Sequence, residues 1–343
     1  MGEGLARAAI VDNPAAVEKA LKGEVPTITL NSVSLVSPDL VRGTSPDKSE
    51  RDMLSTQREG LKAAEGLHKM TVTDPKDGQA KEISVRVKIN PFNFGVNRVV
   101  EGREGKFNRF SILGKKTSGW SYSIDMNKSA LKTMLGDIKD KNLGGDVAAK
   151  LKKLDGKAQP LRDIIADARK TMRSGDAAPK KVKEAKTLFN KASIALAETQ
   201  KEINIITDLA TQIKTMAKDQ SYIVAGDDPY KMASRVVLLS NKLGHSTAFN
   251  CKSGKDRTGQ LDAEIKQLAA TADIEGRVPE PNQKPTEESR KAKIQFALNT
   301  GNLEMQAYNT GLPGYKTALG SLKVQMENEA WPIYRGGSDK VSS

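Results

Sequence analysis

The stretch STAFNCKSGKDRTGQLDAEIK, residues 246–266, contains the only cysteine of a 343-residue chain. Five residues typical of a short strand precede Cys251, a loop with a glycine follows it, and helical spacing resumes after Arg257. The order strand, loop, helix predicts an α/β core around this cysteine. Two lysines and an arginine surround the thiol, whereas an inert buried cysteine would favour apolar neighbours. These surroundings indicate a chemical role for Cys251.

A loop between a strand end and a helix start can bind phosphate through inward-facing backbone N–H groups and the helix N-terminus. Ser253 and Gly254 lie in this loop, where glycine allows a tight curve, and Arg257 can hold two phosphate oxygens at once. The same positive environment is expected to lower the pKa of Cys251, so that its thiolate attacks phosphorus and forms a phosphocysteine. Thr258 is expected to hydrogen-bond the sulfur and help it leave.

The two loop lysines, Lys252 and Lys255, suggest a substrate with several phosphates. They are placed to bind additional phosphates on an inositol ring, which a phosphotyrosine substrate would not carry. The alternative is that they only face solvent.

A general acid must protonate the leaving oxygen, and three aspartates are candidates. Asp256 stands directly before Arg257. Asp227 and Asp228 lie in an upstream loop, and either could instead cap the helix expected from Pro229 to Leu243.

Composition favours an anionic partner other than nucleic acid. The formal net charge is +13 with a pI near 9.5, while aromatic residues make up only 4% and provide few platforms for stacking bases. One cysteine excludes an internal disulfide, and with two histidines it excludes zinc-finger spacing. No metal or cofactor is expected, because Arg257 and the loop backbone supply the positive charge. No apolar run reaches the roughly 20 residues of a membrane span, and no signal peptide is evident.

Local patterns predict further elements along the chain. A short helix is expected in AAVEKALKG, a loop in SPDLVRGTSPDKSERD, and a strand over Ile83–Ile89 that ends at the breaker Asn90-Pro91. The region from about 128 to 216 reads as helical. Within it, one stripe at steps of three and four predicts a long helix: Val182, Ala185, Phe189, Ala192, Leu196, Thr199, Ile203, Ile206, Ala210, Ile213 and Ala217. Gly244 is expected to end the helix before the cysteine strand, and a final helix is expected from about 289 to 298.

The string CKSGKDRTG resembles the active-site loop of inositol polyphosphate 4-phosphatases and of the SopB/SigD/IpgD effector phosphatases. The stretches DPYKMASR (228–235), AFNCKSGKDRTGQLDAEIK (248–266) and NTGNLEMQAYNTGLPGYK (299–316) resemble the same family. So does NFGVN, which contains Asn93, Phe94, Gly95 and Asn97. After this motif the chain continues as RVVEGREGKF, where the family pattern leads us to expect more apolar residues.

The resemblance implies a helix-rich α/β fold with a cysteine-phosphatase-like strand–loop–helix core and a large helical subdomain. The expected organisation is a short N-terminal region, 1–80, a catalytic domain, 81–325, and a tail, 326–343. The helical insertion would span about 128–220.

The function implied is removal of the 4-phosphate from phosphatidylinositol 4,5-bisphosphate at an anionic membrane. Cys251 is the nucleophile and Arg257 the phosphate ligand in this interpretation. Delivery by type III secretion into host cells is implied as well, with a host small GTPase and a secretion chaperone as partners. The family's long N-terminal region, which binds a Rho-type GTPase, is expected to be short or absent.

Three alternatives stay open at this point. The helix over residues 182–217 could serve a non-catalytic module that binds a host protein. The loop could act on phosphotyrosine. A phosphocysteine could also be attacked by an inositol hydroxyl, which would transfer phosphate between ring positions.

Overall fold

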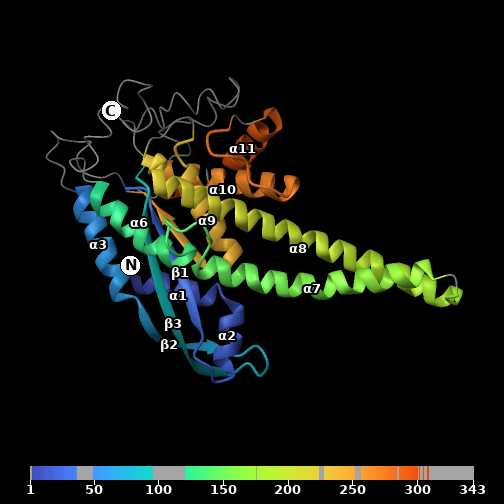
Figure 1. Ribbon diagram of the computed structural model, residues 1–343. Coiled ribbons are helices and arrows are strands. Elements are labelled where there is room, and N and C mark those ends of the chain that lie inside the picture. The colour runs from blue at the N-terminus through green and yellow to red at the C-terminus, as the bar shows by residue number, and fades with distance from the viewer. Residues whose placement is uncertain are drawn as a thin grey trace.

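A twisted four-stranded sheet forms the centre of the computed structural model, and helices cover both of its faces (Figure 1). The strands are β1 (Thr27–Ser34), β2 (Gly66–Thr73), β3 (Ala80–Asn93) and β4 (Ser246–Asn250). The helices are α1 (Gly2–Val11), α2 (Pro14–Leu21), α3 (Ser49–Ala63), α6 (Trp120–Leu135), α7 (Gly145–Arg173), α8 (Pro179–Asp219), α9 (Lys231–Leu243), α10 (Asp256–Glu275) and α11 (Glu287–Asn299). The structure describes residues 2–36, 49–95, 120–174, 176–223, 228–251, 256–283, 286–299, 301, 304, 307 and 308.

The sheet has the order β2-β3-β1-β4. β1 pairs in parallel with both β3 and β4, whereas β2 is antiparallel to β3. The carboxyl ends of the three parallel strands therefore meet at one edge, which is where ligands bind in open α/β sheets. β1 comes from the first 80 residues, so the sheet combines chain from both sides of position 80.

The two faces of β1 pack in separate hydrophobic clusters. Ile28 and Leu30 pack with residues of α1, α2 and β3. Val33 and Leu35, which have the opposite parity and so face the other side, pack with residues of α6 to α10. Every one of these four side chains is buried, and this central strand is therefore fixed on both faces.

The strand predicted over Ile83–Ile89 is present, but the expected break at Asn90-Pro91 is wrong. β3 continues to Asn93, with Pro91 opposite Ser32 of β1. The N–H groups of Arg86 and Phe94 donate to the β1 side, so the odd-numbered Pro91 turns its nitrogen away from β1. On the other side of β3, the pairing with β2 stops at Gly66, which lies opposite Val87. The missing N–H of Pro91 therefore removes no hydrogen bond between strands.

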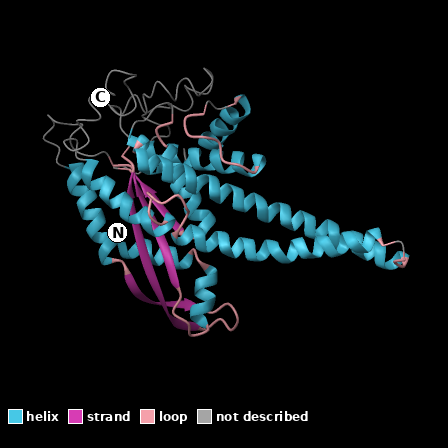
Figure 2. Cartoon of the chain, in the orientation of Figure 1, coloured by secondary structure: helices cyan, strands magenta, loops and turns pink. Residues whose placement is uncertain are grey.

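The predicted long helix is confirmed as α8, which pairs with α7 in a hairpin that projects from the body (Figure 2). All members of the predicted stripe are buried or half-buried. Near the body the stripe joins the core through Ile206 and Ile213. Farther out, the two helices cover only each other.

The elements around Cys251 agree with the sequence pattern, with two corrections. β4 has the predicted bounds, α10 and α11 are helices, and α9 ends at Gly244 with a φ of +78°. Asp228 is not the N-cap of α9, because Tyr230 occupies that position without a capping side-chain bond. The loop expected over 37–52 is helical from Ser49, and its remainder lies outside the described residues. Within the described ranges, no helix is long and apolar enough to cross a bilayer.

Candidate active site

Cys251 follows β4 directly and its side chain lies against the first turn of α10. Only 3% of the residue is exposed. The Thr258 hydroxyl donates to the Cys251 sulfur over 3.3 Å and accepts from the Cys251 N–H at 3.0 Å. The sulfur is therefore held near the positive end of the α10 dipole, where negative charge on sulfur is stabilised.

The backbone of Leu35, just after β1, holds both ends of the loop. Its N–H donates to the Asn250 carbonyl at 2.8 Å, and its own carbonyl accepts from Arg257 Nη1 at 2.7 Å. The side chain of Leu35 is fully buried in the larger hydrophobic cluster. The fixed end of β1 therefore orients the Arg257 guanidinium relative to Asn250, the residue that precedes Cys251.

A second contact reaches the loop from α3. Gln57 Nε2 donates to Asn250 Oδ1 at 2.6 Å, and Asn250 Nδ2 donates to the Cys251 carbonyl at 3.4 Å. Gln57 is only 8% exposed and Asn250 is half-buried, so the contact is partly shielded from solvent. The helix packed beside β1 thus supports the backbone at the start of the loop.

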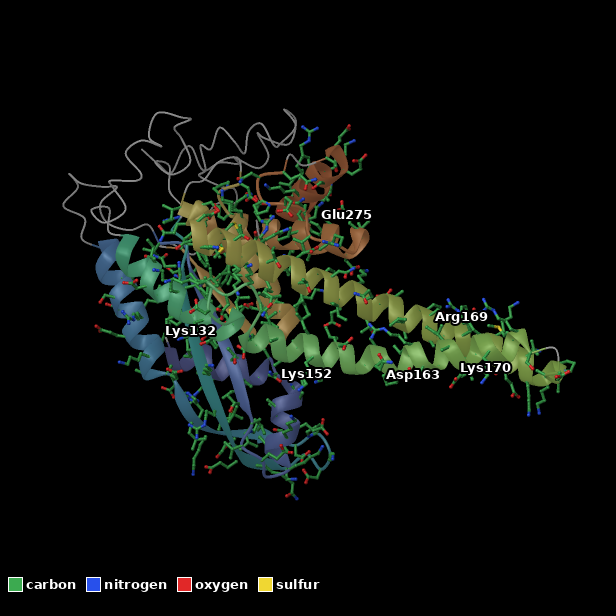
Figure 3. All side chains as sticks on the ribbon, in the orientation of Figure 1. Lys132, Lys152, Asp163, Arg169, Lys170 and Glu275 are labelled. Carbon is green, nitrogen blue, oxygen red and sulfur yellow. The ribbon has the colours of Figure 1, made fainter. Side chains whose placement is uncertain are left out.

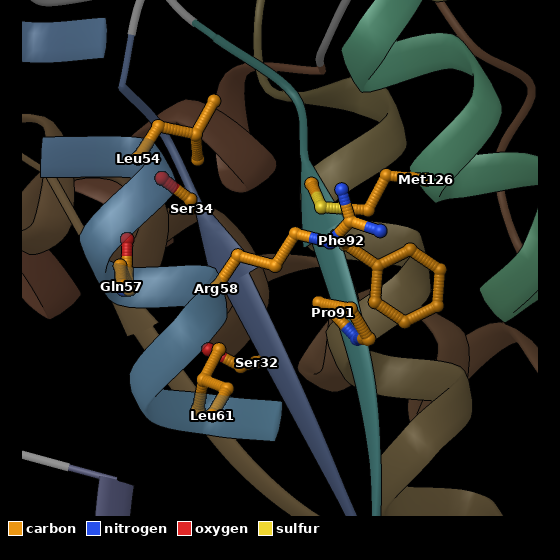
Figure 4. Close-up of a pocket in the computed structure, with 9 residues that line it drawn as sticks. All are labelled: Ser32, Ser34, Leu54, Gln57, Arg58, Leu61, Pro91, Phe92 and Met126. Carbon is orange, nitrogen blue, oxygen red and sulfur yellow. The ribbon is translucent and has the colours of Figure 1, made fainter. Parts of the chain in front are cut away.

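A shallow hollow, open to solvent, lies beside this contact (Figure 4). α3, β1, β3 and α6 contribute its walls. Its lining residues are Ser32, Ser34, Leu54, Gln57, Arg58, Leu61, Pro91, Phe92 and Met126. The close-up shows the Arg58 side chain extending from α3 across β1 toward Phe92 and Met126.

The family-motif residues Asn93, Phe94 and Gly95 join the end of β3 to α6. The Asn93 backbone N–H and carbonyl both bond the Asn127 amide at 2.8 Å, and Asn93 Nδ2 donates to Ser123 Oγ at 2.9 Å. Phe94 donates its N–H to the Ser34 carbonyl and stacks on Phe92. These described members of the motif are buried, and their contacts hold the sheet edge that carries the loop.

Several predicted site residues lie outside the described part of the chain: Lys252, Ser253, Gly254, Lys255, Asp227 and Asn97. The backbone of Asp256 begins α10, but its side chain is also outside. The structure therefore brings together Cys251, Arg257 and Thr258 from the predicted set.

Asp228 lies in a cluster of charged side chains between α9 and α10. Its Oδ2 is 3.5 Å from Arg235 Nη1, and none of its described contacts is with Cys251, Arg257 or Thr258. Burial raises the pKa of Asp228, the Glu264 carboxylate adds to this, and Arg235 opposes it. A carboxyl with a raised pKa tends to carry a proton, as a general acid must.

Sequence reasoning did not identify Leu35, Gln57 or Asn250 as parts of the site. Leu35 acts through its backbone, which leaves no side-chain signal. Asn250 is adjacent to Cys251 in the sequence, which is a local signal, whereas Gln57 is 193 positions from Asn250. Among the residues that the structure describes, no three His, Cys, Asp or Glu side chains gather where they could hold a metal ion.

Comparisons with known proteins place the chain in a family. A family model described as "Enterobacterial virulence protein IpgD" matches residues 2–174 and 180–328. The inositol phosphate phosphatase IpgD of Shigella flexneri is 29% identical over 99% of this chain and 54% of its own length. The inositol phosphate phosphatase SopB of Salmonella typhimurium is 26% identical over 90% of this chain and 45% of its own.

The chain thus spans about half the length of the curated relatives it matches. Among solved structures, the Legionella phosphoinositide phosphatase SidF has a TM-score of 0.56 at 13% identity, over 93% of this chain and 56% of that one. A second structure of a Legionella phosphoinositide phosphatase has a TM-score of 0.54 at 14% identity, over 94% and 55%. These likenesses confirm the expected helix-rich α/β fold. By the extent of the family match, the chain belongs to the IpgD family of enterobacterial virulence proteins, as its sequence motifs predict.

Proposed function

We propose that this chain contains the catalytic domain of a cysteine-dependent phosphoinositide or inositol polyphosphate phosphatase. The observation that carries the proposal is the arrangement of Cys251, Thr258 and Arg257 at the start of α10. A nucleophile, a hydroxyl on its sulfur and an oriented guanidinium meet at the positive end of one helix. Phosphate-ester cleavage through a thiolate requires these groups and, in addition, a general acid.

In the first step, the Cys251 thiolate attacks phosphorus and the bond from phosphorus to the inositol oxygen breaks. The leaving oxygen takes a proton from a general acid, and a phosphocysteine remains. Arg257 binds the equatorial oxygens, where charge accumulates in the transition state. We assign the acid to Asp256, with Asp227 or Asp228 as alternatives.

In the second step, water attacks the phosphocysteine, and inorganic phosphate leaves as the thiolate is regenerated. The Thr258 hydroxyl, 3.3 Å from the sulfur, can donate to it as negative charge returns. This contact supports a role for Thr258 in releasing the sulfur rather than in the first attack.

We infer that the substrate carries several phosphates and that the 4-phosphate of phosphatidylinositol 4,5-bisphosphate is removed. Lys252 and Lys255 would bind the phosphates that are not cleaved. The relatives named inositol phosphate phosphatases, and the structural neighbours named phosphoinositide phosphatases, support this substrate class. The choice of ring position stays a prediction from the resemblance of the loop.

We also infer that the chain acts inside host cells, on the inner face of their membranes, after type III secretion. Its membership in a virulence-protein family supports this setting. A host small GTPase and a secretion chaperone stay predictions from the resemblance alone, as does the organisation into 1–80, 81–325 and 326–343.

The proposal is tested by phosphate release from a panel of phosphoinositides and soluble inositol phosphates, for the native chain and for Cys251→Ser. We expect release by the native chain only. Because Cys251 is the only cysteine, iodoacetamide must label a single site, and inorganic phosphate should slow this labelling. Equal phosphate release by the two proteins would exclude the thiolate mechanism.

The same panel separates the alternatives. Faster release from phosphotyrosine peptides than from lipids would identify a tyrosine phosphatase. Chromatography that resolves ring isomers would reveal phosphate transfer as a new isomer with no free phosphate. Host-protein binding that persists in Cys251→Ser, with no release by the native chain, would favour the interaction module.

A further inference from the structure

The far end of the α7–α8 hairpin is strongly basic. We define the arm tip as residues 167–191, which contain eight Lys and Arg against three Asp and Glu, a local charge of +5. All eight basic side chains of the arm tip are exposed. Figure 3 labels two of them, Arg169 and Lys170, far out along the hairpin.

Ion pairing changes along the hairpin. Near the body, Lys150 pairs with Glu202 and Lys201 pairs with Asp273, each at 2.9 Å. In the arm tip, no basic side chain forms an ion pair with any residue in the described ranges. Within the described residues, no ion pair therefore neutralises the net positive charge of the arm tip. Lysines at steps of three, such as Lys183 and Lys186, also repel each other.

The hairpin also holds this charge away from the body. From Ile205, which is in the core, to Pro179 at the tip is a run of helix about 40 Å long at 1.5 Å per residue. Leu188 is 54% exposed among the tip lysines. An apolar side chain among basic ones is typical of surfaces that lie on anionic lipid.

The arm tip is less suited to binding nucleic acid than to binding anionic lipid. Its one aromatic residue, Phe189, is half-buried and its ring is covered by Arg169, whose guanidinium carbon lies 5.3 Å from the ring centre. Base stacking therefore has no exposed aromatic ring to use here.

We propose that the arm tip docks on an anionic lipid bilayer, such as one that contains phosphatidylserine. The choice of lipid as the partner rests on the proposed phosphoinositide phosphatase function, because that substrate lies in such a bilayer. Each Lys or Arg close to an anionic surface strengthens binding about fivefold. The hairpin then acts as an electrostatic anchor that keeps the catalytic domain at the membrane.

The test variant is Lys180→Glu, Lys181→Glu and Lys183→Glu together. These positions lie in the first turns of α8, where acidic residues are favoured by the helix dipole, so the fold should be retained. The matched control is Lys152→Glu, Lys153→Glu and Lys157→Glu, which makes the same charge change on exposed positions of α7 nearer the body.

The measurement is co-sedimentation with vesicles of phosphatidylcholine, with and without phosphatidylserine, and without phosphoinositide. We expect the native chain to bind only the anionic vesicles, the tip variant to bind at least about tenfold more weakly, and the control to bind as the native chain does. In a separate assay, the rate of phosphate release from a soluble inositol phosphate should be the same for the tip variant and the native chain. The rate of phosphate release from phosphoinositide in anionic vesicles should be lower for the tip variant.

Several outcomes would overturn the docking role. The first is vesicle binding by the tip variant as strong as that of the native chain, and the second is an equal loss of vesicle binding in the control. The others are no vesicle binding by the native chain, and binding of RNA by the native chain that displaces the vesicles. If the native chain binds vesicles through the tip but releases no phosphate from phosphoinositides in them, the proposed function fails and the docking role stands.

Discussion

The Leu35 carbonyl accepts a 2.7 Å hydrogen bond from Arg257, 222 positions later in the chain. The N–H of the same residue donates to Asn250, which precedes the cysteine. The end of β1 therefore contacts residues on both sides of the proposed phosphate-binding loop. The spacing between nucleophile and arginine is supported by β1 as well as by the loop itself, and this leads to the first prediction.

Arg257→Lys should lower kcat/KM by about a hundredfold or more, although it keeps the charge. Lysine cannot bind two phosphate oxygens in a plane while also holding the Leu35 carbonyl. Steady-state kinetics on a soluble inositol phosphate would measure the loss, with Arg162→Lys on the exposed face of α7 as the control. Native activity in Arg257→Lys would show that a point charge is sufficient.

Thr258→Val should slow the second step more than the first. The variant keeps the shape of the side chain but removes the hydroxyl that donates to the Cys251 sulfur. We expect turnover to fall about tenfold to a hundredfold, with a burst of dephosphorylated inositol product before phosphate appears. Rapid-quench measurement of both products would detect it.

Thr258→Ser is the control for that experiment, because serine restores a hydroxyl at the same position. Its rate should be close to that of the native chain. If the valine variant slows both products equally, without a burst, the hydroxyl acts in the first step instead.

Gln57→Leu should destabilise the protein by about 0.5–1.5 kcal/mol, because the half-buried Asn250 Oδ1 would lose its donor. kcat should fall together with the melting temperature, since Asn250 also bonds the Cys251 carbonyl. Thermal unfolding and kinetics of the same samples would measure both. Gln200→Leu, which removes an exposed bond to Asn204, is the matched control and should change neither quantity.

His245 should make the protein sensitive to mild acid. Burial lowers the pKa of His245 below its ordinary value of 6.5, and Lys88 adds to this while Asp146 opposes it. Asn31 Nδ2 lies 3.0 Å from His245 Nδ1, a contact that suits the neutral ring. Between the lowered folded pKa and 6.5 the unfolded chain binds more protons than the folded one.

The free energy of unfolding should therefore fall as pH decreases below about 6.5, and His245 should contribute no pH dependence above that range. Denaturant unfolding between neutral and mildly acidic pH would measure the slope. His245→Gln, which keeps an acceptor for Asn31, should show a smaller slope in this range. An unchanged slope would assign the acid sensitivity to other groups.

Local sequence patterns were sufficient for the elements around the cysteine. The spacing of apolar residues predicted the buried stripe of α8, and Gly244 predicted the end of α9. These features depend on residues within a few positions of each other. The predicted break at Pro91 is wrong because a proline interrupts a strand only where its missing N–H would have bonded a neighbouring strand. On the β2 side of β3, no strand is paired at Pro91.

β1 shows the limit of such patterns. Asn31, Ser32 and Ser34 are polar but buried, so the strand has no alternation that marks it. Asn31 is acceptable there because it bonds Ser240, His245 and Asn90, which come from three other segments. No local rule predicts those partners.

The sequence by itself determined the groups on which the proposed chemistry depends: one thiol, an arginine six positions later and a hydroxyl beside it, on a strand–loop–helix segment whose residues are neighbours in the chain. The tertiary structure alone decided what holds that segment. Leu35 and Gln57 reach it across 222 and 193 positions, through a backbone carbonyl and a buried amide. Such contacts arise only when distant segments pack together, because hydrogen-bond partners are selected by position in space and not by separation along the chain.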